Sequence, residues 1–159
     1  RKYYEANKSS FELKERIVQA KYIAAPVGAQ KMSEAKRWFI STSQQEKFLD
    51  WAEVFATKQS NYKDSIWVPM DDFIAEIPLD ASNPYIYFDR TKKFTCEDTV
   101  LAYFVEVNDV RLEDSYSPLE YVEERVRKVL LNKRRLQLIE RIEENIIEDA
   151  IEEGTLIIY

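Results

Sequence analysis

The sequence of 159 residues contains no histidine and a single cysteine, Cys96. The absence of histidine excludes Ser-His-Asp and Cys-His catalysis, and it removes the usual general base and the commonest ligand of zinc. One cysteine excludes a disulfide within the chain and a cysteine cluster for a metal. We therefore expect no metal and no cofactor, and we expect Cys96 to be a small buried residue.

Glycine and long apolar runs are also scarce. With two glycines, the chain has no flexible linker, no phosphate-binding loop and no dinucleotide fingerprint. No apolar run approaches the roughly 20 residues that span a bilayer, so we expect no membrane insertion by this segment. The net charge of −6 argues against nucleic acid or an anionic membrane as the main partner. The chain begins at Arg1 without a signal sequence, and we expect it to be a fragment of a longer product.

The most regular pattern lies near the end of the chain and predicts one long helix. Ser117 and Glu120 have the spacing of a capping box, Pro118 occupies the first helical position, and Gly154 ends the helix. Between these marks, apolar residues recur at intervals of three and four. Such a helix is roughly 50 Å long, so we expect a partner or a region outside this chain to cover its far half. Its middle is basic and its end is acidic, which is typical of solvated faces.

The last five residues, 155–159, are apolar and β-branched and predict a terminal strand. We expect Leu156, Ile157 and Ile158 not to pair with the sheet of the preceding module, because the long helix carries them away from it. The strand is then frayed or paired with a second copy, which makes a dimer through the tail possible.

The rest of the chain predicts an α+β fold. The first ten residues end a helix, Asp71 caps a short helix, Ser43 and Glu46 form a second capping box, and Asn108 and Asp109 end the strongest strand. The predicted strands are 17–24, 66–70, 85–88, 93–96 and 99–107, the predicted helices are 33–40, 43–56 and 72–77, and 58–64 is a loop.

Four segments carry a resemblance to a known family: V-Q-A-K-Y-I (18–23), F-L-D-W-A (48–52), S-I-W-V-P-M-D-D-F (65–73) and A-Y-F-V-E-V (102–107). Together with the order of elements, they make the chain resemble parvulin-type peptidyl-prolyl isomerases, and more closely the SurA/PrsA kind of cell-envelope foldase. The resemblance implies a parvulin-like antiparallel sheet with flanking helices over 1–116, with its core at about 17–108. Residues 117–159, the long helix and terminal strand, then complete an absent N-terminal region or a partner.

The residues of the family's active site are replaced in this chain. Active parvulins carry two histidines side by side on the central strands, and the matching positions hold Tyr22 and Phe104. The family's Cys or Asp falls between Ser60 and Asp64, where Asp64 is the candidate. Losing the histidines weakens the case for catalysis without excluding it, because proline isomerisation needs no proton transfer.

An apolar peptide site is expected at Trp67, Met70, Phe73 and Tyr103, although packing in the core explains the same residues. If the first three line a groove, at least two of them should be partly exposed.

Three functions are consistent with these features. The first is a periplasmic or cell-envelope folding factor that binds unfolded or proline- and aromatic-containing polypeptide and has lost the isomerase dyad. The second is an active, atypical prolyl isomerase that uses the same groove. The third is a non-catalytic assembly module whose long helix completes a partner's fold.

Overall fold

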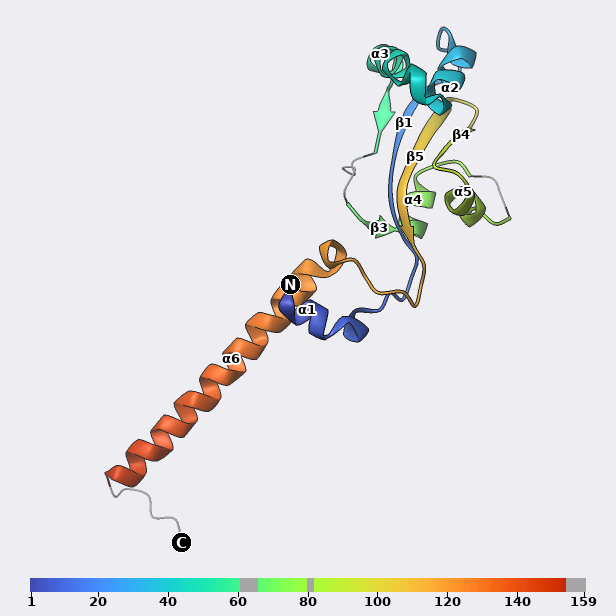
Figure 1. Ribbon diagram of the computed structural model, residues 1–159. Helices are drawn as coiled ribbons and strands as arrows, with labels where there is room; N and C mark the ends of the chain where they lie inside the picture. The colour runs from blue at the N-terminus through green and yellow to red at the C-terminus, as the bar shows by residue number, and fades with distance from the viewer. Residues whose placement is uncertain (61–65, 80–81, 154–159) are drawn as a thin grey trace.

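The computed structural model describes residues 1–60, 66–79 and 82–153, and it confirms the predicted α+β class with an antiparallel sheet (Figure 1). Small helices flank the sheet, and one long helix projects from it. In chain order, the elements are α1 (Lys2–Ala6), η1 (Lys8–Phe11), β1 (Ile17–Pro26), α2 (Met32–Ile40), η2 (Thr42–Gln44), α3 (Gln45–Phe55), β2 (Lys58–Gln59), β3 (Val68–Pro69), α4 (Met70–Ala75), α5 (Tyr85–Arg90), β4 (Lys93–Glu97), β5 (Leu101–Arg111) and α6 (Leu119–Glu152).

The sheet is built on the long antiparallel pair β1 and β5. Its strand order is β2-β1-β5-β4, and β3 pairs with the start of β1. Asn108 and Asp109 do not end β5, as the sequence predicted. The register shifts between Gln19 and Ala20, which pair with Asp109 and Val107, so Asn108 is the extra residue of a β-bulge. The bulge absorbs the polar pair, and β5 continues to Arg111.

The two faces of the sheet are covered by different helices. One face carries the even-numbered apolar residues of β1, such as Val18, Ala20 and Tyr22, and packs against α4 and α5. The other face carries Ala25 and Phe104 and packs against α2 and α3. Because side chains alternate along a strand, these two apolar clusters are separated by the sheet itself.

The long helix α6 has 34 residues, in agreement with the single helix predicted for this region. Its first turns pack against α1 and η1 through Tyr4, Phe11, Val122 and Val126. The beginning of the chain, which the resemblance assigns to the module, therefore packs on the base of α6. Beyond this contact, α6 extends away from the sheet (Figure 1).

Residues 85–88 form part of helix α5, so the predicted strand is wrong. The alternating apolar pattern is too short to separate a strand from a helix. Pro84 precedes the helix, and Phe88 packs edge-to-face on Phe73 and Phe94. The docking of Phe88 on the finished core favours the helix over the local pattern.

The three predicted side-chain caps are not formed. Helix α6 begins after Pro118, α3 after Gln44 and α4 after Pro69, and none of these N-caps makes a side-chain hydrogen bond. Ser117 is instead buried, and its carbonyl accepts a hydrogen bond from the Tyr4 hydroxyl. Asp71 lies in the first turn of α4, where its negative charge interacts favourably with the helix dipole, but its side chain does not cap the helix.

The segment predicted as the loop 58–64 begins with strand β2, which pairs with β1 at Ile23 and Ala24. Gly154 and the predicted terminal strand lie outside the described residues. Within the described ranges, no helix is both long enough and apolar enough to cross a membrane.

Candidate functional site

The structure does not place Tyr22 and Phe104 side by side. Phe104 pairs with Ile23 across β1 and β5, whereas Tyr22 pairs with Val105. Neighbouring residues of a strand point to opposite faces, so the two aromatic side chains lie on opposite faces of the sheet. They belong to different apolar clusters, which corrects the expected pair of dyad positions.

Tyr22 is enclosed in the core on the face covered by α4. Its side chain is 2% exposed, and its ring lies 6.0 Å from that of Phe73 and 5.6 Å from that of Tyr103. Its hydroxyl donates a hydrogen bond of 2.9 Å to the Glu76 carboxylate. A tyrosine held in this way packs the core and satisfies its own polar end.

The predicted peptide-binding residues are mostly core residues. Met70 and Phe73 are fully buried and Tyr103 is nearly so, which assigns all three to packing. Trp67 is partly exposed, and the Arg111 guanidinium lies 5.7 Å from the centre of its ring. Only one of the three residues expected in a groove is therefore accessible. Asp64 lies outside the described residues.

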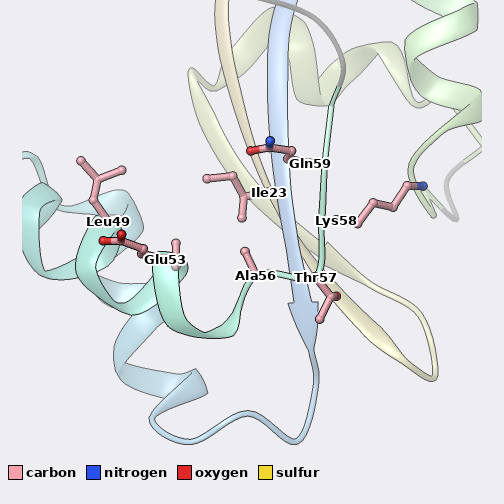
Figure 2. A pocket seen from close by; sticks show the side chains of 8 residues that line it. Ile23, Leu49, Glu53, Ala56, Thr57, Lys58 and Gln59 are labelled. Carbon is pink, nitrogen blue, oxygen red and sulfur yellow. The ribbon is translucent and has the colours of Figure 1, made fainter.

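A different hollow lies on the face covered by α3, between that helix and the edge of the sheet formed by β1 and β2. It has a volume of about 420 Å³. Figure 2 shows Leu49 and Glu53 of α3 on one side, and Ile23 of β1 and Gln59 of β2 on the other. We call this hollow the α3–β2 groove, and its lining residues are Ile23, Leu49, Ala52, Glu53, Ala56, Thr57, Lys58 and Gln59.

The α3–β2 groove is lined by apolar residues, Ile23, Leu49, Ala52 and Ala56, and by polar ones. Leu49 is 50% exposed, although the spacing of apolar residues along 48–56 places it beside the buried side of α3. Phe48, Trp51 and Ala52, on that side, are buried in the core. The sequence does not predict this groove, because residues 58 and 59, which form strand β2, fall in the predicted loop 58–64. The signal in the sequence that could have indicated the groove is the large number of apolar residues on α3, of which Leu49 is left half exposed.

The Lys58 ammonium lies on the opposite face of β2, above two tyrosine rings. It is 5.4 Å from the centre of the Tyr22 ring and 5.9 Å from that of Tyr103. Both distances are within the range of cation–π attraction. This contact tethers β2 to the face covered by α4, while Gln59 reaches toward the groove (Figure 2).

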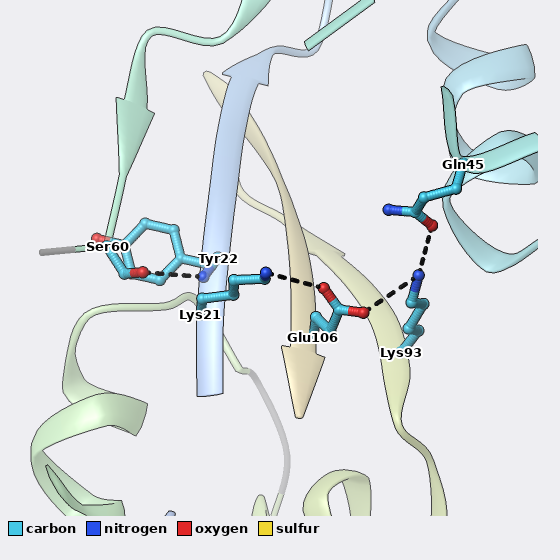
Figure 3. Close-up of polar contacts among 6 residues, drawn as sticks. All are labelled: Lys21, Tyr22, Gln45, Ser60, Lys93 and Glu106. Atoms are coloured by element: carbon cyan, nitrogen blue, oxygen red, sulfur yellow. Dashed lines mark hydrogen bonds and ion pairs between the residues drawn. The ribbon is translucent and has the colours of Figure 1, made fainter. Parts of the chain in front are cut away.

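A row of polar contacts crosses the sheet beside α3 (Figure 3). The Glu106 carboxylate lies 3.4 Å from the Lys21 ammonium and 3.3 Å from the Lys93 ammonium. Lys93 also donates a hydrogen bond of 2.6 Å to the Gln45 side-chain oxygen at the start of α3. Partly exposed ion pairs contribute about 1 kcal/mol or less each, but the row joins β1, β5, β4 and α3. It fixes the position of α3 over the sheet, and hence one wall of the groove.

The other wall is fixed by Ser60, which follows β2. Its backbone N–H donates to the Tyr22 carbonyl at 3.0 Å. Its hydroxyl oxygen accepts a hydrogen bond of 3.2 Å from the Tyr22 N–H, which Figure 3 shows. These two bonds continue the pairing of β1 beyond the two residues of β2. The strand edge at the groove is therefore held at three consecutive residues, 58–60.

The titratable groups near Tyr103 are shifted by local structure. The backbone N–H groups of Leu101 and Val100 lower the pKa of Asp98, and burial raises the pKa of the Tyr103 hydroxyl. Burial, with the nearby Asp98 charge, raises the pKa of Cys96 to about 11. A thiol of that pKa is protonated at neutral pH and is a poor nucleophile.

In the part of the chain that the structure describes, no group of three or more histidine, cysteine or acidic side chains is placed to hold a metal ion. Comparisons of the chain with protein-family models, with curated proteins and with solved structures found no match. The observations define the chain as an α+β module with a four-membered strand path, an open groove at its edge and a projecting helix.

Proposed function

We propose that this chain is part of a cell-envelope protein-folding factor that binds extended polypeptide in the α3–β2 groove and has lost prolyl isomerase activity. The observation that carries the proposal is the groove itself, which is open to solvent and is lined by both apolar and polar residues. Its volume of about 420 Å³ accommodates one or two side chains of a peptide rather than a large cofactor.

The edge of the sheet beside the groove supports the same function. β2 is the first strand of the path β2-β1-β5-β4, and among the described residues no strand lies on its outer side. An extended peptide can add to such an edge through main-chain hydrogen bonds, which do not depend on sequence. An apolar side chain of the peptide can then enter between Ile23 and Leu49. This combination suits a protein that binds many unfolded clients.

The proposed class of protein, a folding factor, and its proposed location, the cell envelope, come from the resemblance to parvulins. That resemblance rests on a predicted order of a strand, two helices, a short strand with a short helix and two strands; the structure adds strand β2 and helix α5 to it. The absence of isomerase activity is proposed because Tyr22 and Phe104 are core residues on opposite faces. No peptide bond can contact both side chains at once.

The groove is tested with Leu49→Glu, which places a carboxylate at its apolar wall. The matched control is Val54→Glu on the same helix, because Val54 is 73% exposed and does not line the groove. Binding is measured by fluorescence anisotropy with a labelled, extended peptide that contains leucine, phenylalanine and proline. Suppression of aggregation is measured with a reduced, denatured client protein.

We expect Leu49→Glu to weaken peptide binding about tenfold or more, because a charge would be left against apolar side chains. Val54→Glu should bind like the wild type, and both variants should melt within a few degrees of it because both sites are exposed. Equal binding by the two variants contradicts the groove as the client site. Catalysis of proline isomerisation by the wild type, in a protease-coupled assay, contradicts the proposed loss of activity.

A further inference from the structure

The far part of α6 presents an apolar face that differs from the face at its base. Val122 and Val126, at the base, are buried against α1 and η1. Ile139, Ile142 and Ile146 are 40%, 47% and 61% exposed. At about 100° per residue, these three isoleucines lie roughly 150° around the helix from the two valines. The exposed face, which we call the distal face, therefore points away from α1.

From residue 128 to residue 153, the charges on the distal face are sorted by sign along the helix; Glu124, on the same face, lies before this stretch. On the side nearer the module, Lys128 and Arg135 lie on this face. On the side nearer the C-terminus, Glu143, Asp149 and Glu153 lie on it. The three isoleucines occupy the middle. A face that is basic at one end, apolar in the middle and acidic at the other is complementary to itself when turned around.

We propose that the distal face binds the distal face of a second copy of this chain in an antiparallel helix pair. The centre of the pair lies between Ile139 and Ile142, so Ile139 of each copy faces Ile142 of the other. Lys128 then lies opposite the second copy's Glu153. Arg135 lies opposite Ile146 of the second copy, and its guanidinium can reach Glu143 of that copy, one helical turn from Ile146. The pair extends over about 40 Å of each helix, which is roughly the three to four heptads that a coiled coil needs.

The charge pattern also selects the orientation. In a parallel pair, Arg135 would face Arg135 and Glu143 would face Glu143, and like charges across a helix interface destabilise it. The symmetric antiparallel pair brings each favourable contact twice. It also requires no room on the side of α6 that α1 and η1 occupy.

The first measurement is the mass of the full chain in solution by sedimentation equilibrium. We expect a concentration-dependent dimer of twice the 18.9 kDa of the monomer. Ile142→Asp should abolish the dimer while leaving the melting temperature of the dilute protein unchanged, since Ile142 is 47% exposed in the monomer. A wild-type chain that is monomeric up to about 100 μM overturns the proposal and leaves the distal face to a different protein.

The second measurement tests the charge sorting. Arg135→Glu alone and Glu143→Arg alone should each raise the dimer dissociation constant about tenfold or more, because each change creates like-charge contacts in two symmetric places. The double variant restores opposite charges and should recover wild-type affinity. Arg141→Glu and Glu144→Arg, on the opposite side of the helix, are the matched controls and should have little effect. If Arg135→Glu and Glu143→Arg leave the dimer dissociation constant unchanged, the dimer forms through another segment, and the proposal is overturned.

The third measurement fixes the orientation with engineered cysteines in a Cys96→Ser background. In the antiparallel pair, Asn132 lies opposite Asp149 of the second copy. A mixture of Asn132→Cys chains and Asp149→Cys chains should oxidise mainly to the mixed disulfide. Predominant self-linking of the Asn132→Cys chains indicates a parallel pair and overturns the proposed arrangement.

Discussion

Truncation of Phe104 to alanine tests whether this residue is a core residue or one wall of an accessible cleft. Its side chain is 1% exposed, and its ring lies 5.4 Å from Phe39, 5.0 Å from Phe48 and 5.6 Å from Trp51 between ring centres. Replacement of a buried phenylalanine by alanine costs about 3–5 kcal/mol in transfer and cavity terms. The surrounding rings come from two helices and cannot all move into the space, so we expect a loss near the upper end of this range.

That loss is large against the roughly 5–15 kcal/mol by which native domains are stable. For a chain of this length, it corresponds to a fall in melting temperature of roughly 10 °C or more. The measurement is urea and thermal unfolding followed by circular dichroism at 222 nm. The control, Val54→Ala on the exposed side of α3, should change stability by about 0.5 kcal/mol or less. A loss below about 1 kcal/mol for Phe104→Ala would show that the aromatic layer under α2 and α3 is not packed as described.

Three further predictions follow from the geometry. The double variant Tyr22→His, Phe104→His should show no prolyl isomerase activity in a protease-coupled assay. The reason is that the two imidazoles would lie on opposite faces of the sheet. Measurable turnover contradicts that placement. Asp98→Asn should lower the melting temperature near neutral pH, because the Asp98 carboxylate accepts two backbone hydrogen bonds of 2.7 Å. The folded protein lowers the pKa of Asp98 below its ordinary value of 3.8. The stabilisation by the Asp98 carboxylate is therefore complete above pH 3.8 and is lost as the pH falls through the lowered pKa of the folded state. A difference in melting temperature between the wild type and Asp98→Asn that persists in strong acid contradicts this role of Asp98. Cys96 is partly buried rather than enclosed as predicted, and its pKa is raised to about 11. It should therefore react with a thiol reagent at pH 8 far more slowly in the folded protein than in urea; equal rates contradict this partial burial.

The sequence by itself determined the elements whose apolar pattern is long enough to have a single interpretation. Helix α6 and helix α3 follow from apolar residues repeated at intervals of three and four, and the cores of strands β1 and β5 follow from runs of eight or nine β-branched, aromatic and other apolar residues. The absence of histidine likewise decided which catalytic mechanisms are impossible. These conclusions need no tertiary contact, because each depends on many residues that agree with one another.

Short segments were decided only in the folded structure. Residues 85–88 become helix α5 because Phe88 packs between Phe73 and Phe94, which lie on other elements. Ser117, Ser43 and Asp71 have the composition of caps, but the helices begin one or two residues away because neighbouring packing sets the chain direction. A local pattern of four or five residues is too weak to resist such contacts.

The candidate site was also decided by tertiary structure. The α3–β2 groove joins Ile23 and Gln59 to Leu49, and the pairing of β1 with β2 that brings them together has no signature in a two-residue strand. The burial of Met70 and Phe73 was equally hidden, because an apolar residue has the same letter in a core and in a binding site. Which face of a strand a residue occupies depends on register and bulges, so the position of Tyr22 relative to Phe104 could be known only from the paired sheet.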